Sequence, residues 1–236
     1  MSEKFILRTI LSLSILVVIC NEILFNEIPE LFNKGDEIGN VLSNFGLAYI
    51  SSFIFYYVVV YMKEEEDKKI IYKHIYEINN DIIHSGRCLV GYLVQASRAN
   101  KSKHNFETMT MESYLEIAKK IKINYVPKNM FYGSYPNKIE AYLTVFIKDG
   151  TKPLVLKYTE RAFQHQKYLS AEYFNLLNNI ISCQFISYHA DKLPSWSETK
   201  TVKEMTFADF PDIFKFISHI QELHKYNQNV FLKYNK

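Results

Sequence analysis

Residues 41–78 read VLSNFGLAYISSFIFYYVVVYMKEEEDKKIIYKHIYEI, and no other segment constrains the architecture of the chain as strongly. The first 22 residues of this stretch, Val41 to Met62, carry no charge. A helix of that length spans about 33 Å, which is close to the thickness of the hydrocarbon core of a bilayer. A buried core helix is the alternative, but core helices rarely run so far without a charged residue. The run therefore predicts a membrane-spanning helix.

A second apolar run, FILRTILSLSILVVICNEILF, precedes it at residues 5–25. Arg8 interrupts its start and Glu22 its end, so these two side chains must reach the two interfaces of the bilayer. A signal peptide is the alternative, but the following CNEILFNEIPE contains no small-x-small cleavage site. We expect residues 1–62 to form a transmembrane hairpin with spans at about 5–25 and 41–62 and a short outside loop at 26–40.

The placement of Lys and Arg predicts the orientation of this hairpin. Lys4 and Arg8 flank the first span, whereas the connecting loop holds one lysine against four acidic residues. Four lysines follow the second span: Lys63, Lys68, Lys69 and Lys73. Positive residues stay on the cytoplasmic side, so both termini are expected in the cytoplasm. Together with a composition rich in Asn, Lys, Ile and Tyr, this predicts a multi-pass protein of a bacterial inner membrane, with the lipid bilayer as a partner.

The segment after the second span continues the helical pattern. KEEEDKK, at residues 63–69, contains no helix breaker and places Glu64 and Glu65 four residues before lysines. A narrow apolar stripe then follows with alternating spacings of four and three. We expect one helix from Val41 to about Ser97, whose stripe either forms a self-associating stalk or packs inside an intramolecular bundle; we favour the bundle. The stripe contains Ile71, Ile75, Ile78, Ile82, Ser85, Leu89, Tyr92 and Ala96.

The remaining chain, to residue 236, predicts a cytoplasmic helical domain at 63–236 and hence an all-α fold. Apolar periodicity indicates helices at about 109–121, at 159–188 and from 207 into the tail. The segment 139–158 is ambiguous, because Asp149-Gly150 would suit the turn of a small β-hairpin. A lone hairpin in a helical chain has marginal stability, so we favour a helix there.

Small residues on the second span suggest a packing face. Such residues let helices approach closely in lipid, and Ala48 with Ser52 has the small-xxx-small spacing. The face packs either against the first span or against another protomer, and we expect a homo-oligomer. Its members are Gly46, Ala48, Ser51 and Ser52.

Chemistry-bearing motifs are absent from the sequence. The formal net charge is only +3 and no basic block occurs, so no nucleic-acid partner is expected. The three cysteines lack metal-ligand spacing, and His219 and His224 are five residues apart on opposite sides of a helix. His189 precedes Asp191 by two residues, but no nucleophile accompanies them. We therefore expect no metal, no cofactor and no enzymatic activity; an enzyme with a new type of site is the open alternative.

A mixture of aromatic and basic residues is the best candidate for a binding surface. Aromatic faces with cationic groups suit a small anionic ligand, whereas tyrosines that fill a helical bundle are the alternative. The candidate residues are Lys128, Tyr132, Tyr135, Lys138, Lys157, Tyr158 and Arg161.

The run LAYISSFIFYYVVVYMKEEEDKK, at residues 47–69, resembles a feature of small, poorly characterised bacterial membrane proteins. These proteins have two N-terminal spans and a cytoplasmic helical domain, and some are encoded near phage-defence or mobile-element genes. The resemblance covers residues 5–73 and carries over no catalytic residue. It implies a membrane effector or sensor that oligomerises and acts on the bilayer. A passive scaffold that recruits a cytoplasmic protein partner is the alternative.

Overall fold

The computed structural model of the chain describes residues 3–24, 34–126, 131–132, 139–140, 142–193, 200 and 204–235. The chain divides into two compact units, Met1–Lys68 and Lys69–Lys236. Apart from one pair of two-residue strands, the regular elements among the described residues are helices, so the predicted all-α class is confirmed.

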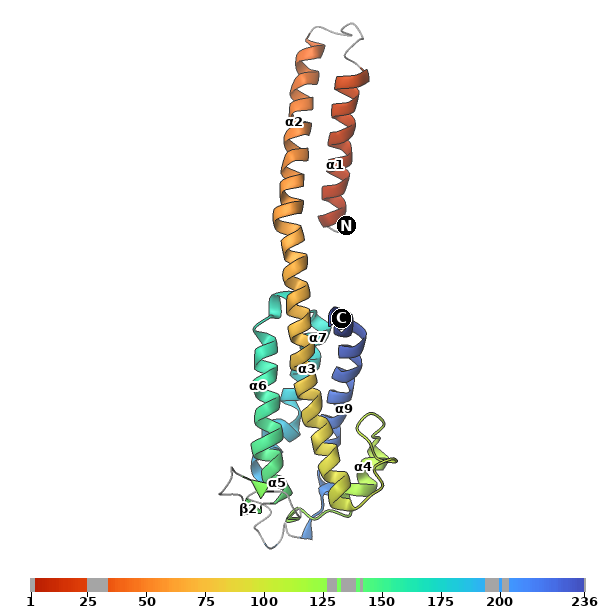
Figure 1. Ribbon diagram of the computed structural model, residues 1–236, viewed down its shortest axis with the longest axis vertical. Helices are drawn as coiled ribbons and strands as arrows, with labels where there is room; N and C mark the ends of the chain where they lie inside the picture. The colour runs from red at the N-terminus through yellow and green to blue at the C-terminus, as the bar shows by residue number, and fades with distance from the viewer. Residues whose placement is uncertain are drawn as a thin grey trace. The chain divides into compact units, whose positions relative to one another are not determined.

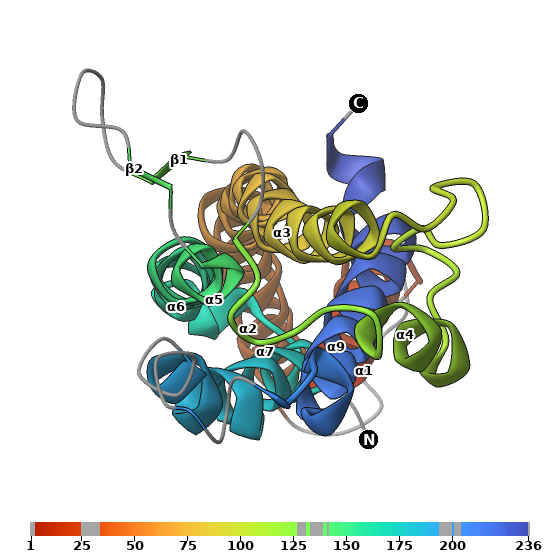
Figure 2. The same cartoon turned by 90° about the horizontal axis from the view of Figure 1, so that it is seen from below.

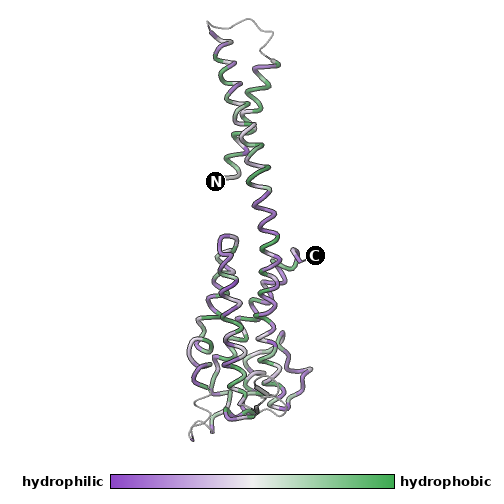
Figure 3. The backbone as a smooth tube through the Cα atoms, turned by 60° about the vertical axis from the view of Figure 1, so that its left-hand side comes forward, coloured by the Kyte–Doolittle hydropathy of each residue, from purple (hydrophilic) through white to green (hydrophobic). Residues whose placement is uncertain are grey.

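The first unit is a pair of helices. Helix α1 (Glu3–Ile19) ends in a π-helical turn (Cys20–Leu24) and lies beside α2 (Gly35–Phe55), as Figure 1 shows. Hydrophobic residues dominate both helices (Figure 3). A second π-helical turn (Tyr56–Tyr61) joins α2 to α3 (Met62–Ser97), so the backbone is helical without a break from Gly35 to Ser97. No proline occurs in this range, which explains why nothing interrupts the helix.

The second unit is a helical bundle. Its elements after α3 are α4 (Met111–Ala118), α5 (Leu143–Phe146), α6 (Lys152–Phe163), α7 (Ala171–Ser182) and α9 (Asp212–Tyr226). Helix α9 lies between α4 and α7, and α3 lies on one side of this row of helices (Figure 2). A π-helical turn (Asn227–Phe231) and a 3-10 turn (Leu232–Tyr234) follow α9.

Side-chain caps define where several of these helices begin. The Thr110 hydroxyl accepts a hydrogen bond from the Ser113 amide at the start of α4, and the Ser170 hydroxyl accepts one from the Tyr173 amide at the start of α7. Such caps satisfy amides that have no partner within the helix. They fix the helix starts to particular residues of the sequence.

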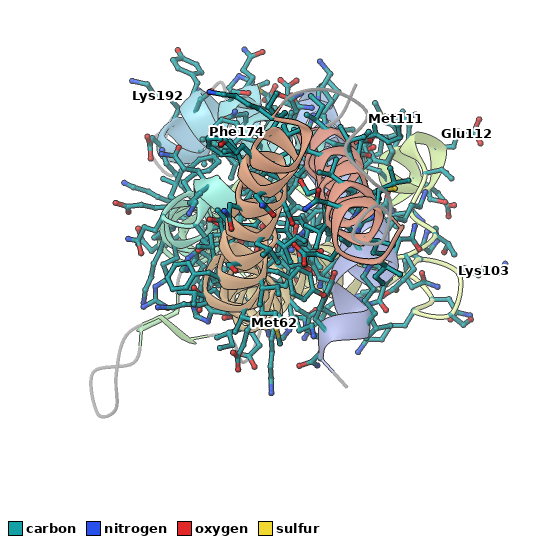
Figure 4. All side chains as sticks on the ribbon, turned by 90° about the horizontal axis from the view of Figure 1, so that it is seen from above. Met62, Lys103, Met111, Glu112, Phe174 and Lys192 are labelled. Atoms are coloured by element: carbon teal, nitrogen blue, oxygen red, sulfur yellow. The ribbon has the colours of Figure 1, made fainter. Side chains whose placement is uncertain are left out.

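The hydrophobic core belongs to the second unit. Every buried apolar side chain among the described residues lies at Ile75 or beyond, and the largest include Tyr114, Tyr173, Phe185 and Phe216. Polar and charged side chains such as Lys103 and Glu112 point away from the bundle (Figure 4). In the first unit, by contrast, only Ser43 and Gly46 are buried among the described residues.

The β-hairpin alternative for residues 139–158 is wrong. Residues 143–163 are helical, with Asp149-Gly150 inside a π-helical turn (Ile147–Thr151) and Pro153 in the first turn of α6. The strand pair joins β1 (Phe131–Tyr132) to β2 (Ile139–Glu140) in antiparallel register, with Phe131 opposite Glu140.

The helical pattern predicted at 159–188 corresponds to more than one helix. Helix α6 ends at Phe163, a 3-10 turn (Gln166–Tyr168) follows, and α7 begins after Ser170. The break folds α7 back, so the Phe163 and Phe174 rings lie 4.7 Å apart between centroids. Apolar periodicity persisted across the corner because both helices face the same core.

Candidate functional site

Helix α6 brings three of the predicted ligand-binding residues together. Val155, Thr159 and Ala162 form its buried face, which leaves Lys157 and Arg161 exposed on the other side. The Lys157 ammonium lies 5.8 Å and the Arg161 guanidinium 5.5 Å from the centroid of the Tyr158 ring. These are cation–π distances, so the two cations are held beside one aromatic ring. We call Lys157, Tyr158 and Arg161 the α6 cationic face.

Of the other four predicted residues, only Tyr132 lies among the described residues, and its side chain is not described. Tyr132 belongs to β1, of which only the backbone is described. Its strand pair lies near the end of α6 where the chain enters that helix (Figures 1 and 2). Lys128, Tyr135 and Lys138 lie outside the described residues.

The small residues of α2 divide into two groups. A Cβ atom on Gly46 would lie 2.9 Å from Val18 Cγ2 and 3.1 Å from the Ser14 carbonyl oxygen, so Gly46 packs directly on α1. Ala48, Ser51 and Ser52 are exposed instead. The Ser52 hydroxyl donates to the Ala48 carbonyl of its own helix at 2.8 Å. Of these four predicted residues, only Gly46 packs against α1.

Two polar contacts also join α2 to α1 and to the π-helical turn that follows α1. The buried Ser43 hydroxyl donates a 3.0 Å hydrogen bond to Glu22 Oε1, and the Tyr49 hydroxyl donates a 3.1 Å bond to the Leu7 carbonyl. Sequence reasoning placed Glu22 at an interface of the bilayer and assigned it no partner. Glu22 and Ser43 are 21 residues apart in the sequence, and no sequence pattern linked them.

The apolar stripe of α3 is buried inside the chain's own bundle. Ile75, Ile78, Ile82 and Leu89 are at most 3% exposed, and Ile71 and Tyr92 are half-buried at the edge of the core. The buried face is wider than the predicted stripe, since it also contains Ile83, Val90, Leu93 and Val94. This width matches a helix covered by several neighbours rather than a two-helix seam.

A buried polar network crosses this face. The Tyr173 hydroxyl on α7 donates a 2.6 Å bond to Asn79 Oδ1, and Asn79 Nδ2 donates a 3.0 Å bond to Asn227 Oδ1. Asn227 Nδ2 in turn donates to Asn80 Oδ1 at 3.1 Å. Burial raises the pKa of the Tyr173 hydroxyl well above its ordinary value, so it stays a neutral donor. In the sequence, the hint of this buried network was Asn79, a polar residue next to the stripe residue Ile78.

The histidine and aspartate examined for catalysis have different partners. Asp191 Oδ2 pairs with the Lys152 ammonium at 2.5 Å. His189 Nδ1 lies 3.4 Å from Asp212 Oδ2, a suitable distance for an ion pair when the ring is protonated. Nearby, burial raises the pKa of the Cys183 thiol, which opposes formation of the reactive thiolate. This geometry supplies no activated nucleophile at Cys183.

Four further histidines lie close to a charged side chain or to each other. His219 Nδ1 is 3.4 Å from Glu222 Oε2, whereas His224 Nε2 faces Arg87 Nη2 at 3.5 Å. His74 and His165 have their rings 5.5 Å apart between centroids. Within the described part of the chain, no three His, Cys, Asp or Glu side chains come together as a group that could hold a metal ion.

Comparison of the chain with models of known protein families, with curated protein sequences and with solved structures found no match. The arguments for function therefore come from the geometry of this chain.

Proposed function

We propose that the protein is a two-span protein of the bacterial inner membrane. The observation that carries this proposal is the exposure of large apolar side chains along both helices of the first unit. Leu13 and Leu16 on α1 are 62% and 58% exposed, and Phe45 and Phe55 on α2 are 71% and 64% exposed. Apolar surface of this extent is unfavourable in water and favourable in lipid.

Helix length supports the same proposal. The segments Phe5–Ile23 and Glu37–Ser97 are long and apolar enough, by length and composition, to hold a membrane span. The core helix of a soluble domain passes the same test but would be mostly buried, whereas none of the first apolar window and only 6% of the second is buried. A cleaved signal sequence remains the competing interpretation of α1 alone.

Membrane insertion and orientation are tested together by cysteine labelling. Glu37→Cys and Lys225→Cys are introduced singly, at exposed positions, into a chain whose native cysteines are replaced by serine. With both termini cytoplasmic, a membrane-impermeant maleimide labels residue 37 in intact cells and residue 225 only after permeabilisation. Labelling of both positions in intact cells would refute this topology, and release by alkaline carbonate would refute insertion.

We further propose that the spans have an active, non-enzymatic role. The second unit would bind a small anionic ligand or a cytoplasmic protein, and the response would alter the packing of α1 against α2. Support comes from α3, which is helical through Lys68 and Lys69, where the two units meet in the sequence, and whose later residues build the core. A continuous helix is stiffer than a Gly/Ser linker, so it suits the transmission of a displacement.

Insertion of Gly-Gly-Ser after Lys69 tests this role. We expect the insertion to abolish the effect of the protein on the cell while leaving insertion into the membrane intact. The matched control is a seven-residue helical insertion, Ala-Glu-Lys-Ala-Ala-Glu-Lys, which keeps the helix and shifts its phase by only about 20°. Equal activity of both variants would contradict transmission through the helix.

The nature of the effect is tested by membrane potential. An effector that rearranges its spans should depolarise cells or release a trapped dye when it is overproduced or when the cells meet phage. A membrane potential that stays intact under every activating condition would eliminate the effector proposal. Full function after replacement of residues 1–62 by an unrelated anchor would instead favour a passive scaffold. The defence setting implied by the resemblance stays a prediction.

A further inference from the structure

A small cavity lies within the first unit. The start of α1 forms one side of it, and the end of α2 and the π-helical turn Tyr56–Tyr61 form the other. Its volume is about 50 Å³, which exceeds the space that a single water molecule needs and suits a small polar group. The lining combines one cation and three phenols with two apolar side chains: Arg8, Tyr56, Tyr57, Tyr61, Leu7 and Phe53.

Stacked aromatic rings form one wall of the cavity. The Phe53 and Tyr57 rings lie 6.5 Å apart between centroids, and the Tyr57 and Tyr61 rings 5.3 Å apart, both nearly parallel. The contact of Tyr49 with the Leu7 carbonyl holds α1 against α2 next to this wall. The position of Arg8, one residue after Leu7, is therefore set by a contact between the two helices.

The charge of Arg8 has no counter-ion in the cavity. The lining contains no carboxylate, and none of the ion pairs among the described side chains includes Arg8. A guanidinium at the boundary of a hydrocarbon layer is stable only when an anion or water solvates it. Phosphate oxygens match its planar set of donors, and tyrosine hydroxyls add further donors beside it.

We propose that this cavity binds the phosphodiester group of an anionic phospholipid, with Arg8 as the charged ligand and Tyr56 and Tyr57 as hydroxyl donors. The lining has no carboxylate to pair with the ammonium group of a zwitterionic headgroup, and the positive charge of Arg8 repels that group. The apolar side chains Leu7 and Phe53 suit the start of the acyl chains. This inference rests on the proposed membrane insertion.

The test uses the full chain reconstituted in vesicles of phosphatidylcholine and phosphatidylglycerol, followed by mild detergent extraction and native mass spectrometry. We expect phosphatidylglycerol to be retained preferentially, and Arg8→Gln to reduce that preference about fivefold, as expected for loss of a charge-assisted contact. Arg8→Lys should keep part of the preference, because it keeps the charge but loses the bidentate geometry. Tyr57→Phe, which keeps the ring stack, should reduce it about twofold.

Lys63→Gln is the matched control, because it removes one positive charge outside the cavity lining. The control should retain phosphatidylglycerol as the unchanged chain does, and circular dichroism should show the same helix content in every variant.

Equal retention of phosphatidylglycerol by Arg8→Gln and by the unchanged chain would overturn the lipid site. Displacement of the lipid by millimolar inorganic phosphate would assign the cavity to a free anion instead. Release of the protein from the vesicles by alkaline carbonate would refute both membrane insertion and the lipid site. A protein that stays inserted but shows no lipid preference would refute the lipid site alone.

Discussion

The Tyr173 hydroxyl donates a 2.6 Å hydrogen bond to Asn79 Oδ1 although 94 residues separate the two in the sequence. Both side chains are fully buried, so water cannot replace either partner. A buried polar atom that loses its partner costs more free energy than the bond contributes when it is made. This contact therefore fixes α7 against α3 in one register.

Removal of that hydroxyl should destabilise the bundle. We expect Tyr173→Phe to lower the free energy of unfolding by about 1–3 kcal/mol, because Asn79 Oδ1 then stays buried without this donor. Thermal unfolding of the full chain in detergent, followed by circular dichroism, measures the loss. The control is Tyr188→Phe at a half-exposed position, which should change stability by less than about 0.5 kcal/mol. Similar losses in both variants would argue against a special role for the network.

The two glycines of α3 in the bundle should respond oppositely to alanine. At Gly91 an added Cβ meets no atom within 4 Å, so Gly91→Ala should stabilise the helix by about 1 kcal/mol. At Gly86 the same Cβ would lie 3.0 Å from Ile220 Cγ2 and 3.2 Å from Phe106 Cε2. Gly86→Ala should therefore lower the unfolding midpoint while Gly91→Ala raises it. A rise of the midpoint in both variants would show that α9 is not packed closely at Gly86.

The contact between α1 and α2 should depend on Gly46. Gly46→Leu places a large side chain against Val18 and the Ser14 carbonyl, and overpacking of this kind costs about 1–3 kcal/mol. We expect a lower unfolding midpoint in detergent. Ala48→Leu is the matched control, because residue 48 is exposed and the new side chain would point away from α1. A loss confined to Ala48→Leu would instead indicate that residue 48 packs against another protomer.

Acid should destabilise the bundle through two histidines. The pKa of His165 is lowered below 6.5, mainly by burial and to a smaller extent by the charge of the neighbouring His74. The pKa of His224 is likewise lowered, mainly by burial and then by the charge of Arg87, while Glu107 raises it in part. The unfolded chain therefore binds protons first as the pH falls through about 6.5, so stability that is present above this pH is lost below it.

The unfolding midpoint should accordingly fall between about pH 7.5 and pH 5.5. His165→Gln and His224→Gln should each reduce the size of that fall. His74→Gln should also reduce it, because His74 contributes to the lowered pKa of His165. A midpoint that rises on acidification would contradict the direction of both pKa shifts.

The α6 cationic face should bind anions without contributing to stability. Lys157 and Arg161 are exposed, so Lys157→Ala with Arg161→Ala should change the free energy of unfolding by less than about 1 kcal/mol. We expect pyrophosphate to raise the unfolding midpoint of the unchanged chain and not that of the double variant. Lys101→Ala with Lys103→Ala removes the same charge from an exposed loop and should keep the response. Loss of the response in both variants would point to net charge rather than to this face.

Local sequence patterns determined the helices of this protein. The uncharged run from Val41 to Met62 and the stripe from Ile71 to Tyr92 each predict a helix, because a helical hydrogen bond joins residues only four apart and one face repeats every 3.6 residues. The same pattern could not locate the corner at Ser170, since two helices that face one core keep the same apolar periodicity. The same pattern did not decide between strand and helix at 139–158, because Pro153 suited the start of a helix as well as a β-turn.

Tertiary structure alone decided which distant residues meet. Nothing in the spacing of Asn79 and Asn227, which are 148 residues apart, predicted their hydrogen bond. His189 lies two residues before Asp191, yet its carboxylate neighbour is Asp212 while Asp191 pairs with Lys152. Adjacent residues on a helix point in different directions, so proximity along the chain did not bring the two side chains together. These pairs form because burial of apolar faces sets how the helices pack, and polar groups trapped in that packing take the partners within reach.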